Sequence, residues 1–417
     1  MIRQLKNLLW HLPKSIFWNF YFGFPGHKLT LIGVTGTDGK TTTCTLMQKL
    51  LENSGIKCGL ISTISSPGLH TTSPGPKDLQ KILSDYKKLG YTHVVCEVTS
   101  HALDQYRYWG CHFKISVMTN ISHEHLDYHK TLKNYIAAKA KLFSQSTLAI
   151  LNRDDPHYLT LKKLVKTPTL TYGIKNKSDI TAKNIKVTPT LLSFTINGKT
   201  FTTDSNYEYQ IYNILACYSV FSKLDLDLNI FSQTITNFPE TKGRREKVDN
   251  NLRLKTIIDF AHTPNALSAT LTSLRQSTSG RLIVIFGATG GRDKTKRPIM
   301  GKNVSQIANI AIITADDTRN EKVEAINQQI ISGINPDQSI EIDPLNPLIT
   351  KAAIFHYADI PNRQDAFNLA VKIAKPGDTI IACGKGHETT ILHGKTEYPW
   401  SEAEAFRTAF RLKTQNV

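Results

Sequence analysis

The chain has 417 residues, 40% of them hydrophobic, and a formal net charge of +17. This length and composition predict a globular protein of two or three domains with substantial hydrophobic cores. The six cysteines are scattered singly, which argues against a zinc ribbon and a disulfide framework and favours a reducing, cytoplasmic setting. The positive charge predicts anionic partners, and phosphates or carboxylates of small substrates suffice. We expect no nucleic-acid partner, because no RNP motif, zinc finger or basic heptad helix is present.

The first 28 residues mix basic and aromatic side chains. No apolar run reaches the ~20 residues that span a bilayer, and Pro13 divides the segment. A signal peptide is also disfavoured, because no small-residue cleavage site follows an apolar core. Two interpretations remain: residues 1–26 lie on a membrane surface as an amphipathic helix, or they pack as an aromatic arm on the following domain. We favour packing, because apolar stretches are more often covered than exposed.

From residue 29 the chain alternates short β-branched runs with segments of helical period. The segments 41–53 and 77–89 have the helical period. The strand-like runs are 29–36 ("LTLIGVTG"), 58–63 ("CGLIST"), 93–98 ("HVVCEV"), 114–120 ("KISVMTN") and 148–152 ("LAILN"). This βαβ pattern predicts a mostly parallel sheet covered by helices.

The pattern changes in two later regions. Residues 179–203 alternate as strands around an Asn197–Gly198 turn, which predicts a β-hairpin appendage. The Pro and Gly residues near 239–243 indicate a domain boundary. Beyond it a second βα series begins, with strand-like runs at 256–261, 281–290, 309–317 and 379–386. We therefore expect an arm (1–28), a central domain (29–241) and a C-terminal domain (242–417).

The stretch "LIGVTGTDGKTTTC" (31–44) has the features of a phosphate-binding loop. A strand runs into glycines and then into a helix, so that backbone N–H groups and the helix N-terminus can hold an anion. Lys40 could reach terminal phosphates and Thr41 could ligate Mg²⁺. The spacing of the ordinary P-loop is not met, because Val34 stands where its first glycine would be. The alternative is a glycine turn before an ordinary helix.

The run Gly-Thr-Asp-Gly-Lys-Thr-Thr in this context resembles the loop of the Mur ligase superfamily. Members of that superfamily phosphorylate a carboxylate to an acyl phosphate, which an amine then attacks to form an amide. The resemblance implies a P-loop-type central ATPase domain with a mostly parallel sheet, followed by a Rossmann-like α/β domain. It also implies that the chain must supply metal ligands, a carboxylate site and an amine site.

Three further motifs match the superfamily in order. Glu97 ends a strand in "CEVTSHALDQYR", His125 follows another strand in "TNISHEHLDYH", and Lys139 lies in a predicted helix. In the superfamily the matching Glu and His bind magnesium, and the matching lysine is carbamylated to N6-carboxylysine, whose carboxylate helps to hold the metal. The resemblance thus implies Lys40, Glu97, His125 and Lys139 as catalytic residues and Thr41, Glu97, His125 and Lys139 as metal ligands.

The resemblance also extends to the nucleotide. Asn213 matches a residue that contacts adenine, and basic groups after the domain boundary could read the γ-phosphate only when the domains close. The implied ATP-binding residues are Gly36, Thr37, Asp38, Gly39, Lys40, Thr41, Thr42, Asn120, Asn213, Arg244, Asp259 and His262.

Three stretches, at 285–301, 314–321 ("TADDTRNE") and 383–388 ("CGKGHE"), look like one branch of the superfamily. This branch adds a diamino acid to a UDP-N-acetylmuramoyl dipeptide during synthesis of the peptidoglycan precursor. The residues matching its acceptor site are Thr71, Thr72, Thr99, Gln105 and Arg107. The residues matching its amino-acid pocket are Arg292, Asp317, Arg319, Gly384 and Glu388.

The identity of the diamino acid depends on residues 316–319. Members of the branch that use meso-diaminopimelate read Asp-Asn-Pro-Arg there, and the arginine binds the distal carboxylate. This chain keeps Arg319 but has Asp317 and Thr318 in place of Asn-Pro. Arg319 favours diaminopimelate, whereas a carboxylate at Asp317 suits lysine or ornithine unless it pairs with a nearby arginine. We favour diaminopimelate.

The sequence departs from the family elsewhere. Before "LDYH" it reads His123-Glu124-His125 rather than Arg-Asp-His, and "YEYQ" replaces the usual approach to Asn213. Family members begin with a whole domain that contacts the uridine diphosphate, whereas only the aromatic arm precedes residue 29 here. We therefore expect the nucleotide of the acceptor to be held by another surface or partner, or the acceptor to lack UDP.

Two other classes of function are weaker interpretations. A folylpolyglutamate-synthase-like ligase would lack the "GKGHE" motif, and an amidotransferase-partnered ligase would carry a cysteine zinc module. A non-catalytic scaffold at a membrane surface would not need Lys40, Thr41, Glu97, His125 and Lys139 together. We expect a cytoplasmic monomer that uses ATP, Mg²⁺ and small-molecule substrates.

Overall fold

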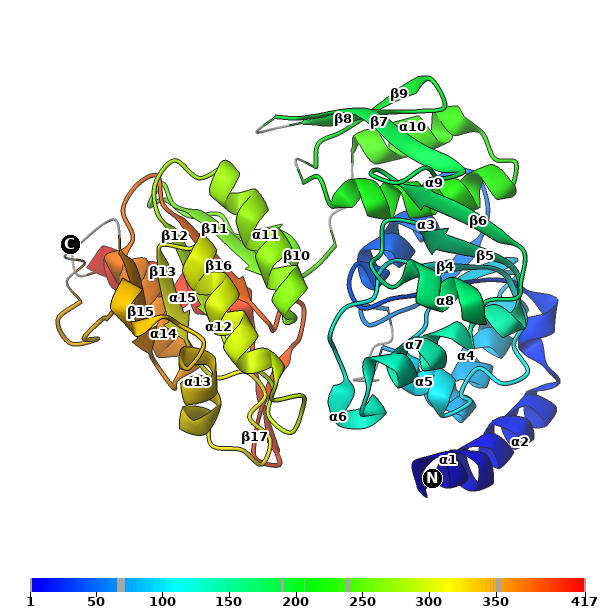
Figure 1. The fold of residues 1–417 in the computed structure, drawn as a ribbon, viewed down its shortest axis with the longest axis horizontal. Helices are drawn as coiled ribbons and strands as arrows, with labels where there is room; N and C mark the ends of the chain where they lie inside the picture. Colours follow the sequence, from blue (N-terminus) through cyan, green and yellow to red (C-terminus); the bar gives the residue numbers. More distant parts are fainter. Residues whose placement is uncertain are drawn as a thin grey trace. The chain divides into compact units, whose positions relative to one another are not determined.

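The computed structural model describes residues 2–65, 72–188, 191–205, 207–237, 241–347, 349 and 354–415. The chain forms two compact units (Figure 1). The first comprises Met1–Ser122 and His129–Pro239, and the second comprises His123–Tyr128 and Glu240–Val417. Each unit contains one large sheet with helices on it, so the predicted α/β class with mostly parallel sheets is confirmed.

The first unit is built on a nine-stranded sheet with the order β2-β3-β1-β4-β5-β6-β7-β8-β9. The pairs from β2 to β7 are parallel, and β7, β8 and β9 are antiparallel. The strands are β1 (Thr30–Thr35), β2 (Cys58–Ile61), β3 (His93–Glu97), β4 (Phe113–Met118), β5 (Ser146–Asn152), β6 (Thr169–Gly173), β7 (Ile180–Val187), β8 (Leu192–Ile196) and β9 (Lys199–Thr203).

Strands β1 to β4 are buried on both faces of this sheet, which is why they read as continuous apolar runs, whereas β7, β8 and β9 alternate buried with more exposed residues. Ile32 faces a core under α3 (Lys40–Asn53), α9 (Gln210–Lys223) and α10 (Leu228–Thr236). Its neighbour Leu31 faces a core under α4 (Pro76–Lys88) and α5 (Ser100–Asp104). A third core lies under α7 (Leu132–Ala140), η3 (Phe143–Gln145) and α8 (Tyr158–Leu164). The side chains of successive residues alternate between the two faces, as a strand requires.

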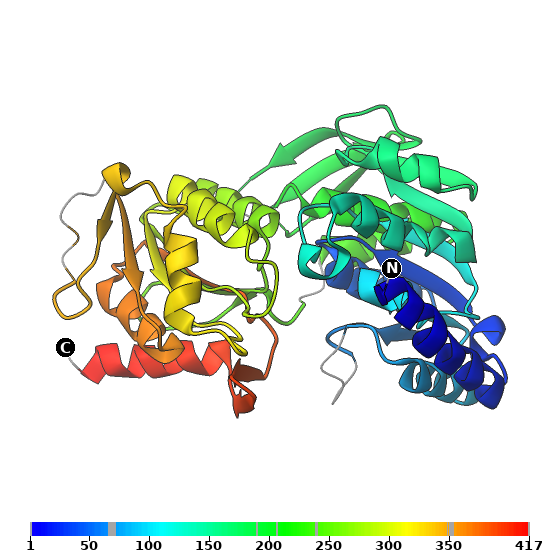
Figure 2. The same ribbon diagram turned by 60° about the horizontal axis from the view of Figure 1, so that its bottom comes forward.

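The amino-terminal arm is helical and lies on the outside of the first unit (Figures 1 and 2). It comprises α1 (Ile2–Lys6), the π-helical turn η1 (Asn7–His11), α2 (Leu12–Phe22) and the 3-10 turn η2 (Pro25–Lys28), and α2 packs on α4. Pro13 lies in the first turn of α2, so the segment is divided directly before it, where the π-helical turn ends and α2 begins. Among the described residues, no helix is both long and apolar enough to cross a membrane.

The second unit contains a seven-stranded sheet with the order β10-β11-β16-β12-β13-β15-β14, in which only the β10–β11 pair is antiparallel. A separate hairpin is formed by β17 and β18. The strands are β10 (Arg244–Lys247), β11 (Lys255–Asp259), β12 (Leu282–Phe286), β13 (Ile310–Ile313), β14 (Ser339–Glu341), β15 (Phe355–Asp359), β16 (Thr379–Cys383), β17 (Thr390–His393) and β18 (Thr396–Pro399).

Helices cover both faces of the second sheet as well. One core lies under α14 (Arg363–Ile373) and α15 (Glu402–Gln415). The other lies under α11 (Pro264–Gln276), α12 (Lys296–Ile307) and α13 (Val323–Ile331), and the short turn η4 (Pro336–Gln338) follows. The segment His123–Tyr128, in which α6 (Leu126–His129) begins, groups with this unit although it follows β4 in the chain.

Candidate functional site

The phosphate-type loop follows β1 and ends at the first turn of α3. Gly36 has φ 151° and Gly39 has φ 79°. A Cβ atom on Gly36 would lie 1.8 Å from the Thr119 hydroxyl oxygen, and one on Gly39 would lie 2.5 Å from Oδ1 of Asn213. Both positions therefore require glycine, and the loop backbone lies directly against its neighbours.

The loop is fixed by the residues that follow β4. Oδ1 of Asn120 accepts a hydrogen bond from the Asp38 N–H at 2.9 Å, and its Nδ2 donates to the Asp38 carbonyl at 3.0 Å. The Thr119 hydroxyl donates to the same carbonyl at 2.7 Å, and the Thr37 N–H donates to the Asn120 carbonyl at 2.8 Å. The predicted residue Asn120 thus holds the loop in shape from the adjacent strand.

Lys40, Thr41 and Thr42 form the first turn of α3, where helix N–H groups are directed at the loop. The Lys40 ammonium donates to the Thr37 carbonyl at 2.7 Å, so in this structure it is folded over the loop. Asn213, on α9, accepts a hydrogen bond from the Thr43 hydroxyl at 3.3 Å. The structure therefore brings Asn213 to the same loop.

Glu97 ends β3 beside the start of α3 and is only 2% exposed. The Thr41 hydroxyl lies 3.1 Å from each of its carboxylate oxygens. The Thr63 N–H and hydroxyl each lie 3.2 Å from Oε2. A buried carboxylate beside a hydroxyl is an oxygen donor set that fits Mg²⁺. No group of three or more His, Cys, Asp or Glu suited to a metal occurs within the described parts of the chain.

Lys139 is almost completely buried, with 1% exposure, in the last turn of α7. Its ammonium donates to the Gly36 carbonyl at 2.6 Å and lies 4.5 Å from the ring centre of Tyr135. The Tyr135 hydroxyl in turn lies 3.1 Å from the hydroxyl of Thr37. The structure therefore brings Lys139 to the loop that carries Lys40 and Thr41.

Ser73 connects Thr99 and Arg107 of the predicted acceptor site. Ser73 donates from its hydroxyl to the Glu97 carbonyl at 3.0 Å and accepts from the Thr99 N–H at 3.0 Å. Its carbonyl accepts from Nη1 of Arg107 at 2.6 Å, and Nη2 of the same guanidinium donates to Oε1 of Gln105 at 2.8 Å.

Threonines lie on both sides of this serine in the predicted acceptor site. The Thr72 hydroxyl accepts from the Thr63 hydroxyl at 2.9 Å, so it connects to the surroundings of Glu97. Thr99 caps α5 by accepting from the Ala102 N–H at 3.2 Å. Thr71 lies outside the described residues.

His125 belongs to the segment that groups with the second unit, so the structure does not assemble it with Glu97 and Lys139 within one unit. It has φ 57°, and 30% of its side chain is exposed. The neighbouring Glu124 is buried and accepts from the Lys296 ammonium at 3.1 Å and 3.2 Å. The longer carboxylate at Glu124 is therefore matched by a buried cation.

Three predicted ATP-binding residues lie at the β10–β11 edge of the second unit. The Arg244 guanidinium lies 4.2 Å from the ring centre of Phe260. Asp259 is buried, which raises its pKa, and it accepts from the N–H groups of Arg245 and Ala261 at 2.9 Å and 2.8 Å. The His262 carbonyl accepts from Lys296 at 3.0 Å.

The predicted amino-acid pocket is organised around Lys385, which is 1% exposed. Its ammonium donates to Asp317 at 2.7 Å and forms an ion pair with Glu388 at 2.5 Å. Burial raises the pKa of Glu388 to about 7. The charges of Asp316 and Asp317 also raise this pKa, whereas the charge of Lys385 lowers it. Gly384 has φ 109°, and a Cβ there would lie 2.7 Å from Oδ2 of Asp316. Its lack of a side chain lets the strand end approach that carboxylate.

The two predicted pocket arginines lie close enough to affect one another. Burial and the charge of Arg319 lower the pKa of Arg292, and Nη1 of Arg292 lies 4.0 Å from Asp127. Arg319 has φ 51°, and its Nε is buried without a hydrogen-bond partner among the described residues. A buried donor of this kind normally has an acceptor, which a substrate carboxylate would supply.

Ser73, Thr63 and Lys385 were not among the residues predicted from sequence. Lys385 lies between Gly384 and Glu388 in "CGKGHE", and this position between two predicted pocket residues could have identified it as a pocket residue. Ser73 follows Thr72 directly, but nothing in the sequence showed that it bonds to Glu97 and Thr99. Long-range hydrogen bonds of this kind depend on the tertiary fold.

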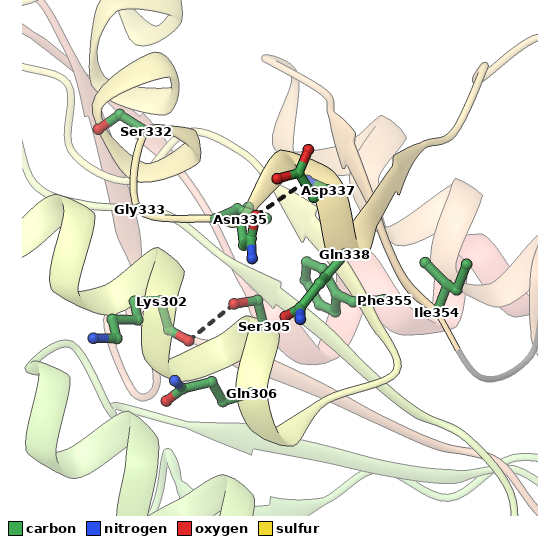
Figure 3. Close-up of a pocket in the computed structure, with 11 residues that line it drawn as sticks. Lys302, Ser305, Gln306, Ser332, Gly333, Asn335, Asp337, Gln338, Ile354 and Phe355 are labelled. Atoms are coloured by element: carbon green, nitrogen blue, oxygen red, sulfur yellow. Dashed lines mark hydrogen bonds between the residues drawn. The ribbon is translucent and has the colours of Figure 1, made fainter.

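A hollow in the second unit contains none of the predicted site residues (Figure 3). It lies between the C-terminal part of α12 and η4. Its polar groups bond locally: the Ser305 hydroxyl donates to the Lys302 carbonyl at 2.9 Å, and the Asp337 N–H donates to Oδ1 of Asn335 at 3.1 Å. The chemistry predicted for this chain therefore does not lie in this hollow.

Comparison with known proteins bears directly on this arrangement. Residues 34–221 match the Mur ligase middle domain, and residues 243–386 match the Mur ligase glutamate ligase domain. The chain is 36% identical over 398 residues to UDP-N-acetylmuramoyl-L-alanyl-D-glutamate–2,6-diaminopimelate ligase 1 of Clostridium acetobutylicum, which covers 93% of this chain and 79% of the relative. The corresponding ligase of Aquifex aeolicus is 35% identical, with 93% and 78% covered. The chain belongs to the Mur ligase family.

Solved structures agree with this membership. A structure of a UDP-N-acetylmuramoyl-L-alanyl-D-glutamate–2,6-diaminopimelate ligase superimposes with a TM-score of 0.60 at 28% identity, over 93% of this chain and 79% of that one. Folylpolyglutamate synthase of Mycobacterium tuberculosis has a TM-score of 0.70 at 16% identity, over 96% and 95%, and shows a shared fold. As a Mur ligase, the chain is an ATP-dependent enzyme that forms amide bonds.

Proposed function

We propose that this Mur ligase adds meso-diaminopimelate to UDP-N-acetylmuramoyl-L-alanyl-D-glutamate during synthesis of the peptidoglycan precursor. It acts as a cytoplasmic monomer on small-molecule substrates. Relatives at 36% and 35% identity bear the name of this reaction. The site residues matched from sequence, apart from Thr71, have described positions in one or other unit.

The pairing of Asp317 with Lys385 is the observation that carries the choice of amino acid. A free carboxylate at Asp317 would repel the distal carboxylate of diaminopimelate and favour lysine. Lys385 donates to this carboxylate at 2.7 Å, and the Leu392 N–H donates to the same oxygen at 3.0 Å. Asp317 is therefore paired with a lysine rather than with an arginine, and Arg319 keeps its buried Nε available for a carboxylate.

The phosphate loop supplies the binding site for ATP. The N–H groups at the start of α3 and the ammonium of Lys40 would neutralise the phosphate oxygens after Lys40 leaves the Thr37 carbonyl. The carboxylate of the acceptor attacks the γ-phosphorus, ADP leaves, and an acyl phosphate remains. The amine of the diamino acid then attacks the acyl carbon, and inorganic phosphate leaves with its bonding electrons and takes up the proton that the amine nitrogen loses.

Thr41 and Glu97 would hold Mg²⁺, which when bound withdraws charge from the phosphate oxygens. The resemblance adds His125 and a carbamylated Lys139 to this set. The position of Lys139 supports the modification, because its buried amine lies at the loop, where a new carboxylate would be oriented by the surrounding hydrogen bonds. Carbamylation would replace the buried ammonium by a carboxylate, whose charge the bound Mg²⁺ would balance.

Phosphate release from ATP tests the proposal directly. The purified chain is incubated with UDP-muramoyl dipeptide and with diaminopimelate, lysine or ornithine in turn. We expect release that depends on diaminopimelate and on the acceptor. Arg319→Ala should raise the KM for diaminopimelate by roughly 100-fold and leave that for lysine unchanged, because a buried charged hydrogen bond contributes about 2–3 kcal/mol. Arg411→Ala, at an exposed position of α15, is the control. If phosphate release did not depend on any of the three amino acids, the proposed ligase activity would be refuted.

A further inference from the structure

The helical arm of residues 2–22 binds to the first unit through polar side chains. Asn7 and Asn19 are 3% and 0% exposed. Nδ2 of Asn7 donates to the carbonyl of Asp104 at 3.0 Å and to its Oδ2 at 2.8 Å. Nδ2 of Asn19 donates to the Trp109 carbonyl at 2.6 Å. The polar side of this helix therefore faces the protein, which reverses the usual arrangement of a surface helix.

The outward side of the arm is apolar. Seven of the sixteen large apolar side chains that are exposed among the described residues lie within residues 5–21, with exposed fractions between 50% and 68%. They are Leu5, Leu8, Leu9, Trp10, Phe17, Phe20 and Tyr21. Soluble proteins expose such side chains singly, so a cluster of this size marks an interaction surface.

All the charged residues in the sequence of the arm are basic. The first acidic residue of the chain is Asp38. The ammonium of Lys14 lies 4.0 Å from the ring centre of Trp10, so cations and aromatic rings share the surface. The basic residues before Asp38 are Lys6, Lys14, Lys28 and Arg3, of which Arg3 pairs with Asp104 of the first unit at 3.3 Å.

We propose that this face docks on the surface of an anionic lipid bilayer, with the aromatic side chains at the level of the headgroups. Trp and Tyr prefer that level, and each nearby Lys or Arg contributes about 1 kcal/mol of attraction to anionic lipid. An interfacial helix normally turns a polar face to water, and here the first unit satisfies that face instead. The helix is already folded before it binds, so little ordering opposes docking.

Vesicle flotation of the full chain tests this proposal. Vesicles of phosphatidylcholine with about 30% phosphatidylglycerol are compared with phosphatidylcholine alone, at about 50 mM and about 500 mM salt. We expect the protein to float with the anionic vesicles at low salt, and at least tenfold less with neutral vesicles or high salt. Phe17→Ser/Phe20→Ser/Tyr21→Ser should reduce flotation at least tenfold. Leu159→Ser/Leu345→Ser removes exposed apolar side chains elsewhere and should leave flotation unchanged.

Light scattering, thermal unfolding and ligase activity without vesicles complete the test. The triple variant should remain folded and active, because its side chains face outward. Failure of the unaltered protein to float would refute the proposal, as would equal flotation of the triple variant. If the unaltered protein is a dimer and the triple variant is a monomer, the apolar face binds a second copy of the chain and the proposal is refuted. If the triple variant does not fold, Lys6→Glu/Lys14→Glu replaces it, and undiminished flotation of that variant refutes the proposal.

Discussion

The phosphate loop of the first unit and the amino-acid pocket of the second unit are stabilised in different ways. In the loop, Gly36 and Gly39 bring the backbone into contact with neighbouring strands and helices, and hydroxyls and carbonyls make most of the hydrogen bonds. In the pocket, the carboxylates of Asp317 and Glu388 share the cation of Lys385. The loop is fixed mainly by shape, whereas the pocket is fixed mainly by charge.

This difference determines how each site responds to substitution. A side chain added in the loop must displace backbone or strand residues, which are tightly packed and cannot move cheaply. A charge removed from the pocket leaves its partner unpaired, but a second substitution can restore the balance. Loop variants should therefore lose activity in a way that second substitutions do not recover, and pocket variants should be rescued by matched changes.

The largest effect is expected for Gly36→Ala. Its Cβ would lie 1.8 Å from the Thr119 hydroxyl oxygen, so the loop would shift away from the phosphates. We expect kcat/KM for ATP to fall on the order of 100-fold or more, because displacement of about 1 Å has such effects. Gly75→Ala is the control, since its Cβ would make only an ordinary 3.8 Å contact with Asp78. Unchanged ATP kinetics in Gly36→Ala would show that the loop does not bind the nucleotide.

Lys139→Ala should reduce turnover by about 100-fold, the lower end of the range for loss of one charge-stabilising group. Because the proposed active group is a carboxylate, short carboxylic acids should restore part of the activity by occupying the space left by the side chain. Lys141→Ala, two positions along the chain, removes an ammonium that pairs with Asp104; it is the matched control and should show no rescue. Mass spectrometry of the intact protein should detect added carbon dioxide in the unaltered chain. Full activity of Lys139→Ala would contradict the assignment.

Lys385→Met should weaken diaminopimelate binding by roughly 30- to 100-fold. It leaves Asp317 and Glu388 without their cation, and breaking a buried pair costs several kcal/mol, of which binding would lose about 2–3 kcal/mol. Lys385→Met/Asp317→Asn should recover most of the loss, because it removes the unpaired carboxylate as well. Steady-state KM values for diaminopimelate and lysine measure the effect. If the double variant binds no better than the single one, Lys385 acts by some means other than neutralising Asp317.

The sequence predicted the elements that carry the site, because buried parallel strands and the glycine loop leave strong local patterns. Strands β1, β3 and β4 and helices α3 and α7 occur where "LTLIGVTG", "HVVCEV", "KISVMTN", the segment 41–53 and Lys139 indicated them. Pro13 marks the start of α2, because a proline is tolerated in the first turn of a helix.

Other features could not be predicted because they depend on residues far apart in the chain. Asp317 was expected to pair with an arginine if it paired at all, and Lys385 lies 68 positions away. The polar attachment of the arm joins Asn7 to Asp104, 97 positions apart. Composition suggested that the apolar residues of the arm would be covered, but the hydrogen-bonding capacity of two asparagines reversed the orientation of the helix.

The smallest effect is expected from the titration of Glu388. Its pKa is raised to about 7, and an ionised carboxylate is needed to attract the ammonium of the diamino acid. The KM for diaminopimelate should therefore rise as the pH falls below about 7, approaching tenfold per pH unit. The folded pKa of Glu388 lies above the ordinary 4.5, so between these values the folded state binds more protons than the unfolded state. The free energy of unfolding should therefore fall as the pH rises from 4.5 towards 7.

Glu388→Gln should abolish both pH dependences. The change in stability should be small, since 36% of the side chain is exposed and solvent screens its charge. Glu404→Gln, at an exposed position of α15, removes a carboxylate without touching the pocket and should leave both profiles intact. A KM that rises equally at low pH in Glu388→Gln would assign the titration to another group, and the raised pKa of Glu388 would then have no part in selecting the substrate.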